Sequence, residues 1–183
     1  MKENFPTLTS SRFILRQLGD DDLEDVFKGL SNPAITKYYG VSYDNLEATK
    51  VQMSWYANLE KNNKGIWWAV CSKTDGSFLG AGGLNDISHV HKKAEIGYWL
   101  YPENWGKGIM SETMPLIYDH AFNNLGLHRI EGFVEPKNTN CKKAIAKLGF
   151  TLEGTMVDCE IKNGSHISLD IYAKSLTRSE KTE

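Results

Sequence analysis

Hydrophobic and polar residues follow two different periods in the first third of the chain. Residues 12–18 alternate loosely between apolar and polar side chains and lie between turn formers, which predicts a β-strand. Residues 20–22 are acidic and offer helix caps, and the apolar residues after them recur at the i, i+3, i+4, i+7 spacing of a helix face, at Leu23, Val26, Phe27 and Leu30. Asn32-Pro33 predicts a short helical piece, and residues 45–62 predict a longer helix.

The middle of the chain predicts three successive strands. Residues 66–71 are rich in strand formers and precede Thr74-Asp75-Gly76, a hairpin signal. Residues 78–87 then form the return strand, and residues 94–100 form the next one. Because no helical pattern separates these strands, we expect them to pair antiparallel.

The second half of the chain alternates between helical and extended patterns. A helical stripe follows Gly108 and ends at Gly126, residues 129–134 predict a fifth strand, and a second helix runs to Leu148. Residues 151–161 and 165–173 predict a final hairpin whose turn is Asn163-Gly164.

This order of elements predicts an α+β (mixed α/β) fold with a central, mostly antiparallel sheet of seven strands flanked by helices. Parallel pairing is expected only at the helical crossovers on either side of residues 129–134. We expect a single domain over residues 1–174, followed by a charged tail over residues 175–183.

Composition narrows the class of protein. With 183 residues, 40% hydrophobic and 24% charged, the chain suits one globular core. The net charge of −2 gives no reason to expect direct binding of nucleic acid. Three cysteines, far apart, suit a reducing compartment better than a disulfide framework or a zinc site, and no apolar run has membrane-spanning length. We therefore expect a cytoplasmic protein that binds neither membrane nor metal.

One stretch, residues 95–112, carries the chemistry. It reads as a strand, a proline turn, a glycine loop and the start of a long helix. The first N–H groups of a helix have no internal partner and carry the positive end of its dipole, and glycines let a ligand approach the backbone closely. We expect this helix start to bind the pyrophosphate of a cofactor through six consecutive residues, Gly106, Lys107, Gly108, Ile109, Met110 and Ser111.

The chain also resembles a known family. The motifs are Trp105-Gly106-Lys107-Gly108-Ile109-Met110, the preceding strand 95–100, and the later Asn138-Thr139-Asn140-Cys141 and Lys147-Leu148-Gly149-Phe150. Together they resemble the GNAT superfamily of acetyl-CoA-dependent N-acetyltransferases. The opening residues 8–16 and the late Asp170-Ile171-Tyr172 are similar to its ribosomal-protein N-acetyltransferase branch.

The resemblance implies acetyl-CoA as cosubstrate and a sheet that splays apart between the fourth and fifth predicted strands. It implies that the pantetheine arm contacts Trp99, Leu100 and Tyr101 on the fourth strand, with Asn138 binding the arm from the other side. Two residues depart from the wider family pattern: Trp105 stands where Gln or Arg is usual, and Met110 replaces a small residue.

Acetyl transfer to an amine needs a proton acceptor, because only the neutral amine attacks the thioester, and a proton donor for the departing thiolate. Glu95 is our candidate acceptor, acting directly or through water, and a structural ion-paired glutamate is the alternative. Cys141 stands where the resembled branch commonly has a serine that protonates the thiolate, and a plain core cysteine is the alternative. His89 and His91 lack a third metal ligand, so we predict no metal site.

Three functions remain open on the sequence. The first is N-acetylation of a protein or peptide N-terminal α-amine, and the second is acetylation of a small-molecule amine such as a polyamine, an amino acid or an aminoglycoside. The third is a non-catalytic acyl-CoA-binding sensor. A Rossmann-type nucleotide module does not fit, because the strand before the loop belongs to an antiparallel run. Unpaired strand edges make a homo-oligomer possible.

Overall fold

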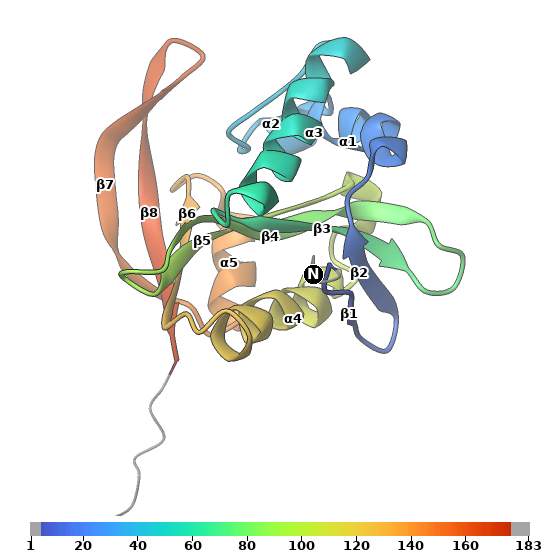
Figure 1. Cartoon of the computed structure of the whole chain (residues 1–183). Helices are drawn as coiled ribbons and strands as arrows, with labels where there is room; N and C mark the ends of the chain where they lie inside the picture. Colours follow the sequence, from blue (N-terminus) through green and yellow to red (C-terminus); the bar gives the residue numbers. More distant parts are fainter. Residues whose placement is uncertain (1–4, 177–183) are drawn as a thin grey trace, which may run out of the picture.

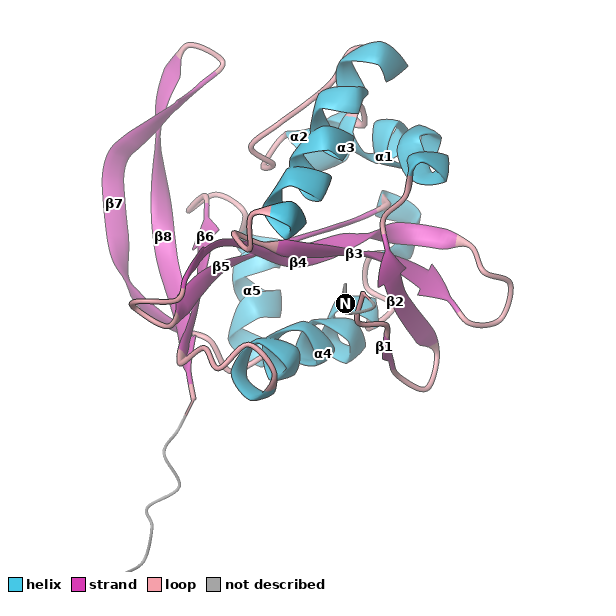
Figure 2. Cartoon of the chain, in the orientation of Figure 1, coloured by secondary structure: helices cyan, strands magenta, loops and turns pink. Residues whose placement is uncertain are grey.

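The computed structural model describes residues 5–176 as one sheet with helices on both faces (Figures 1 and 2). The sheet has eight strands in the order β1-β2-β3-β4-β5-β6-β8-β7. Every neighbouring pair is antiparallel except β5 and β6, which are parallel. The strands are β1 (Leu8–Thr9), β2 (Phe13–Gln17), β3 (Ile66–Ser72), β4 (Phe78–Ser88), β5 (Lys93–Leu100), β6 (Arg129–Val134), β7 (Thr151–Lys162) and β8 (Ser165–Ser175).

The predicted fold class is confirmed, but the predicted number of seven strands is one too few. The missed strand is β1, which has only two residues and pairs with Ile14 and Leu15 of β2. Two residues are too short to carry a recognisable period, so no sequence pattern marks this strand.

The helices lie close to the predicted ranges. They are α1 (Leu23–Leu30), α2 (Pro33–Thr36), α3 (Leu46–Lys61), α4 (Ile109–Asn123) and α5 (Thr139–Lys147), with 3-10 turns η1 (Asp20–Asp22) and η2 (Pro102–Asn104). Asn32 and Asn45 cap α2 and α3, because their side-chain oxygens accept hydrogen bonds from the N–H groups of Ala34 and Ala48.

The sheet separates two hydrophobic clusters. On one face α4 and α5 pack through residues such as Ile117 and Ile145 against Leu15, Trp68 and Ile130 of the sheet. On the other face α1 to α3 cover a cluster rich in aromatic residues: Val26, Leu30, Ile35, Tyr56, Trp67, Phe78, Trp99 and Tyr101 belong to it. Figure 1 shows this three-layer arrangement, with α3 above the sheet and α4 below it.

The sheet opens within its single parallel pair, at the point where the pairing of β5 with β6 ends. β5 and β6 are in register only over Lys93, Ala94 and Glu95, opposite Arg129, Ile130 and Glu131. Beyond Glu95 the two strands run on to Leu100 and Val134 without pairing to each other. The expected splay between these strands is therefore present, and it leaves one edge of β5 free for a ligand.

No helix within residues 5–176 is long and apolar enough to cross a membrane. β8 ends at Ser175, the first residue of the predicted tail. Residues 177–183 of that tail lie outside the described residues.

Candidate active site

The glycine loop lies between η2 and α4, at the open end of β5. Gly106 and Gly108 have φ angles of +73° and +75°, a left-handed conformation that glycine adopts without strain. No residue within 5–176 accepts a hydrogen bond from the backbone N–H groups of residues 106–111. A side chain built on Gly106 would meet nothing within 4 Å. This accessible row of donors at a helix start fits a pyrophosphate.

The side chains around the loop leave those donors accessible. Trp105 donates its indole N–H to the carbonyl oxygen of Leu100 at 2.9 Å, which ties the loop to the end of β5. Ile109 is buried, and Met110 packs against the core cluster below the sheet. Lys107 and Ser111 are exposed. Met110 departs from the family pattern, but its side chain packs against the core, so its backbone N–H stays available to a ligand.

The free edge of β5 presents alternate residues. Tyr101 donates its N–H to the carbonyl oxygen of Leu79 on β4, at 2.9 Å. Because the backbone groups of successive residues in a strand point to opposite neighbours, Trp99 also faces β4, whereas Tyr98 and Leu100 face the gap toward β6. Of the three residues expected to contact the pantetheine arm, Leu100 therefore faces the gap together with Tyr98, which the sequence did not single out, whereas Trp99 and Tyr101 face β4.

The side chains of Trp99 and Tyr101 are also committed elsewhere. Trp99 is 4% exposed and packs in the aromatic cluster, and its ring lies directly against Gly29 of α1. The Tyr101 hydroxyl donates to Asp25 of α1 at 2.9 Å. These two side chains hold α1 on the sheet, and the contact of Trp99 and Tyr101 with the pantetheine arm stays a prediction.

Glu95 is the last residue of β5 that pairs with β6, so its carboxylate lies where the gap begins. It is half-buried and shares a sheet face with Gly97 and Trp99. Burial, helped by the negative charge of Asp86, raises its pKa from the usual 4.5 to about 7, and Glu160 adds a smaller repulsion. Half of the Glu95 carboxylates are thus deprotonated near neutral pH, which suits a proton acceptor.

Glu131, the register partner of Glu95 on β6, has the opposite electrostatic environment. It accepts hydrogen bonds from Lys93 at 2.9 Å and from Arg129 at 2.8 Å. Burial raises the pKa of Glu131, but these two cations outweigh it and leave that pKa below its usual value. Of two adjacent glutamates, Glu131 is therefore the ion-paired structural one, and Glu95 is not ion-paired to any residue within 5–176.

Cys141 lies in the first turn of α5, on the other side of the gap. Its N–H donates to the side-chain oxygen of Asn138 at 3.2 Å, so Asn138 caps the helix and only its NH₂ group is free for a ligand. Burial raises the pKa of the Cys141 thiol to about 11, which keeps it protonated at neutral pH. The thiol is half-buried and touches the core cluster, so the geometry accommodates both the proton-donor and the core interpretation.

A salt bridge fixes the position of α5. Lys142 lies 2.7 Å from the buried carboxylate of Asp170 on β8, which also accepts a hydrogen bond from Thr155 of β7. Asp170 belongs to the late motif Asp170-Ile171-Tyr172, and no role was assigned to it from the sequence. In the structure it anchors α5 to the sheet.

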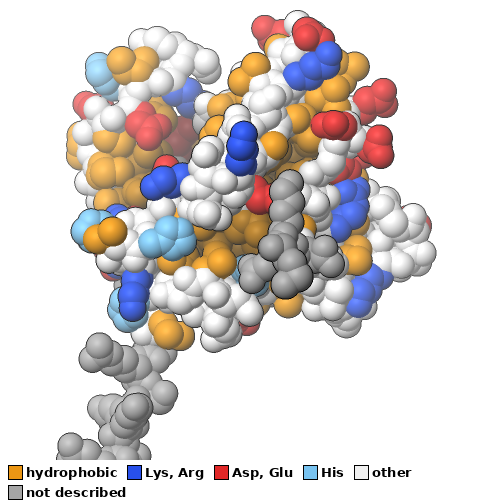
Figure 3. All heavy atoms as spheres, viewed as in Figure 1, with side chains coloured by type: hydrophobic (Ala, Val, Ile, Leu, Met, Phe, Trp, Pro, Cys, Tyr) orange, Lys and Arg blue, Asp and Glu red, His pale blue; other side chains and the backbone are white. Residues whose placement is uncertain are grey.

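The face of the sheet that bears Glu95 is hollowed between two lobes. Figure 3 shows a notch between the end of the β7–β8 hairpin and the α1–α3 helices. Lys162 at the end of β7 joins the two lobes, donating to the carbonyl oxygen of Lys37 and to the carboxylate of Glu135, both at 2.7 Å.

No group of three or more His, Cys, Asp or Glu side chains in the described part of the chain is arranged to hold a metal ion. His89 contacts the carbonyl oxygen of Asn63, and His91 is exposed.

Comparison with known proteins agrees with this geometry. The model of the acetyltransferase (GNAT) domain family matches residues 12–151. YoaA of Bacillus subtilis, an uncharacterised N-acetyltransferase, is 32% identical over 170 residues, which cover 92% of this chain and 96% of YoaA.

Two solved structures share the fold. The ribosomal α-N-protein acetyltransferase RimL, in complex with coenzyme A, has a TM-score of 0.84 at 22% identity, covering 93% of this chain and 98% of RimL. The spermidine N-acetyltransferase of Vibrio cholerae, in complex with coenzyme A and spermine, has a TM-score of 0.80 at 23% identity, covering 91% and 96%. The chain therefore belongs to the GNAT acetyltransferase family and is an N-acetyltransferase that uses acetyl-CoA.

Proposed function

We propose that this enzyme moves the acetyl group of acetyl-CoA to the N-terminal α-amine of a protein or peptide, by direct attack of the amine on the thioester. The observation that carries this proposal is Glu95, a half-buried carboxylate with a pKa of about 7 at the mouth of the gap between β5 and β6. The choice of an α-amine as acceptor rests on the lower pKa of that amine.

The cosubstrate lies, in this proposal, across the open end of the sheet. The backbone N–H groups of residues 106–111 bind the pyrophosphate, and Lys107 adds positive charge when its flexible side chain turns toward it. The pantetheine arm follows the free edge of β5 and contacts the backbone of Tyr98 and Leu100. Asn138 donates its free NH₂ group to the arm from the side of β6.

The lower pKa of an α-amine favours it over an alkyl amine as the acceptor, whatever the pKa of the base. An α-ammonium group has a pKa near 8, so moving its proton to a carboxylate of pKa about 7 costs about 1.4 kcal/mol. An amine like that of lysine has a pKa near 10.4, and the same transfer costs about 4.6 kcal/mol. The difference of about 3 kcal/mol corresponds to roughly a hundredfold difference in the fraction of acceptor activated.

Cys141 completes the proposed reaction as the donor to the departing thiolate. As the tetrahedral intermediate collapses, the carbon–sulfur bond breaks and the sulfur of coenzyme A takes a proton. Burial keeps the Cys141 thiol protonated, but its pKa of about 11 also makes it a weak acid. Its contribution is therefore expected to be smaller than that of Glu95.

A small-molecule amine is the second candidate acceptor. Asp86 and Glu160 both act on the pKa of Glu95, and both are exposed, so negative charge surrounds the proposed acceptor entrance. Such a surface attracts a polycation. The solved spermidine N-acetyltransferase, with spermine bound, shares the fold of this chain.

The test is the release of free coenzyme A thiol with a panel of acceptors. Peptides with different N-terminal residues, the same peptides with a blocked α-amine, lysine side-chain amines, spermidine and an aminoglycoside are compared by kcat/KM. We expect turnover with free α-amines and its loss on blocking. Preference for spermidine or the aminoglycoside would move the assignment to small-molecule amines, and binding of coenzyme A without any turnover would overturn the proposal.

A further inference from the structure

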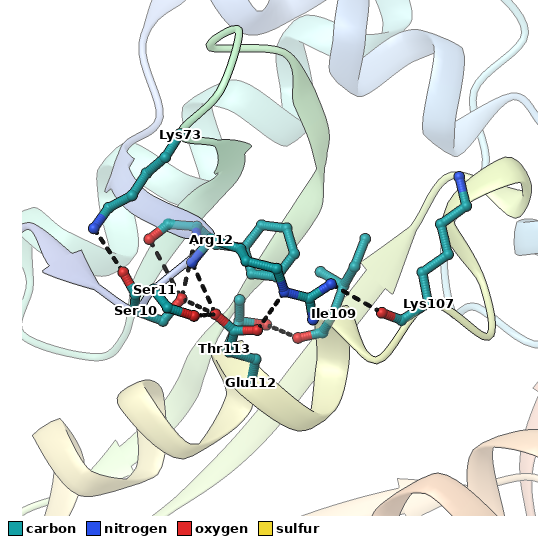
Figure 4. Close-up of polar contacts among 9 residues, drawn as sticks. Ser10, Ser11, Arg12, Lys73, Lys107, Ile109, Glu112 and Thr113 are labelled. Carbon is teal, nitrogen blue, oxygen red and sulfur yellow. Dashed lines mark hydrogen bonds and ion pairs between the residues drawn. The ribbon is translucent and has the colours of Figure 1, made fainter.

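The turn between β1 and β2 lies against the first turn of α4, about a hundred residues later in the sequence (Figure 4). Glu112 makes the contact. Its Oε1 accepts hydrogen bonds from the hydroxyl of Ser10 at 2.7 Å, from the hydroxyl of Ser11 at 2.9 Å and from the N–H of Arg12 at 3.0 Å. Its Oε2 accepts from Nε of Arg12 at 2.7 Å. Four donors thus converge on one carboxylate.

The charge state of Glu112 follows from these donors. The Ser10 hydroxyl and the Arg12 backbone and guanidinium lower the pKa of Glu112 to about 2, so the carboxylate is ionised throughout the physiological range. A carboxylate with four donors has no spare basicity for proton transfer. Glu112 is therefore neither a general base nor only a favourable charge at the helix start.

Arg12 connects this carboxylate to the glycine loop. While Nε binds Glu112, Nη1 of the same guanidinium donates to the carbonyl oxygen of Lys107 at 3.3 Å. Nη2 lies 3.6 Å from the position that a Cβ on Gly108 would occupy. Figure 4 shows the guanidinium between the carboxylate of Glu112 and the Lys107 carbonyl.

The contact between Arg12 and the Lys107 carbonyl also sets the direction of the Gly108 N–H group. In a trans peptide the C=O and the following N–H point in opposite directions. Arg12 holds the carbonyl of Lys107 on its own side, so the N–H of Gly108 points away from Arg12. The left-handed Gly108, at φ +75°, has no Cβ to restrict rotation of this peptide group, and an outside contact has to fix it.

We propose that Arg12 and Glu112 form a clasp that orients the Lys107–Gly108 peptide group and presents the Gly108 N–H to the pyrophosphate of acetyl-CoA. This rests on the cofactor site proposed above. Arg12 and Glu112 are positioning residues in it, since neither has to touch the cofactor. A donor held in its binding direction before the ligand arrives loses less conformational entropy on binding, so the clasp acts on cofactor affinity.

The discriminating experiment uses two acetyl donors. Acetyl-CoA carries the 3′-phospho-ADP group with its pyrophosphate and S-acetylpantetheine lacks it, so a change in the ratio of their kcat/KM values reports on the binding of that group. The variants are Glu112→Gln, which weakens the clasp, and Arg12→Lys, which keeps the charge but loses the fork that spans Glu112 and Lys107. Glu47→Gln, which alters an exposed Glu–Lys pair on α3, is the matched control.

For Glu112→Gln and Arg12→Lys we expect the acetyl-CoA to S-acetylpantetheine ratio to fall about tenfold. The Kd of coenzyme A, measured by calorimetry, should rise by a similar factor, while kcat at saturating acetyl-CoA stays within about twofold. Glu47→Gln should match the wild type. Unfolding curves identify any variant that fails to fold. If Glu112→Gln does not fold, Arg12→Lys is used to test the inference.

Two outcomes would overturn the inference. In the first, both folded variants bind coenzyme A as the wild type does. In the second, they lose activity equally with both acetyl donors, which would indicate a general distortion rather than a lost orientation of the loop. A wild type that binds no coenzyme A would instead refute the cofactor site itself, so the two failures are distinguishable.

Discussion

Replacing Glu95 by Gln is expected to slow acetyl transfer and, above neutral pH, to stabilise the protein. The pKa of Glu95 is raised in the fold, so the folded state holds a proton that the unfolded state releases between pH 4.5 and about 7. Stability therefore falls as pH rises through this window, because the folded state binds more protons. Above it, the ionised Glu95 costs stability that a neutral Gln does not.

The size of the effect follows from the two pKa values. A shift from 4.5 to about 7 corresponds to about 3 kcal/mol at pH 8, as an upper bound before solvent screening of the half-buried group. At pH 5 only about 1 kcal/mol of this cost has developed. The stabilisation of Glu95→Gln relative to the wild type should thus grow by about 2 kcal/mol between pH 5 and pH 8.

Urea unfolding at pH 5 and pH 8 measures this difference. Glu131→Gln is the matched control, because it makes the same chemical change on the register partner whose pKa is lowered by Lys93 and Arg129. That control should lose stability at pH 8, where the wild-type carboxylate is ionised and paired. If Glu95→Gln shows the same stability difference from wild type at both pH values, the carboxylate is not perturbed and the reasoning fails.

The same variant has a kinetic signature. In the wild type, kcat/KM for a peptide acceptor should rise with pH through about 7 as Glu95 loses its proton. Glu95→Gln should lower kcat/KM by roughly a hundredfold and remove that step, with the Kd of coenzyme A unchanged. A pH profile that keeps the step in the variant would remove Glu95 from the reaction.

Three further predictions test the rest of the site. Cys141→Ser should retain more activity than Cys141→Ala, because a hydroxyl can still donate a proton, and equal kcat values would assign Cys141 to the core. Trp105→Phe removes the indole donor to Leu100, and the KM for acetyl-CoA should rise about threefold to tenfold, since one hydrogen bond contributes about 1 kcal/mol; an unchanged KM would show that this tether does not hold the loop. Gly29→Ala places a methyl group into the Trp99 ring and should lower the free energy of unfolding by about 1–3 kcal/mol, and a urea midpoint equal to wild type would contradict that packing.

Much of the local structure was predictable because its causes are local. Asn32 and Asn45 cap helices at the predicted positions, Asn163-Gly164 forms the predicted turn with φ angles of +49° and +76°, and β6 has the predicted bounds Arg129–Val134. Caps, turns and strand periods depend on residues within a few positions of one another. The glycine loop was predictable for the same reason.

Contacts between distant segments were not predictable from the sequence. Trp99 and Tyr101 lie in the predicted strand, but whether their backbone groups face β4 or the gap depends on the register of β5 with β4. The two glutamates Glu95 and Glu131 have the same side chain on neighbouring strands, but burial and Asp86 raise the pKa of Glu95 whereas Lys93 and Arg129 lower that of Glu131. Neither the register nor these neighbours has a signature within one segment.

The sequence by itself determined the order of helices and strands, the glycine loop and, through its motifs, the acetyltransferase family. These follow from hydrophobic periods, caps and turns, which act over one helical turn or one strand. The tertiary structure decided that β5 and β6 part after Glu95, that burial and Asp86 raise the pKa of Glu95 to about 7, and that Glu112 joins the N-terminal turn to α4. Each of these depends on which distant groups share a small volume and how much water reaches them, and that is set only when the chain has packed.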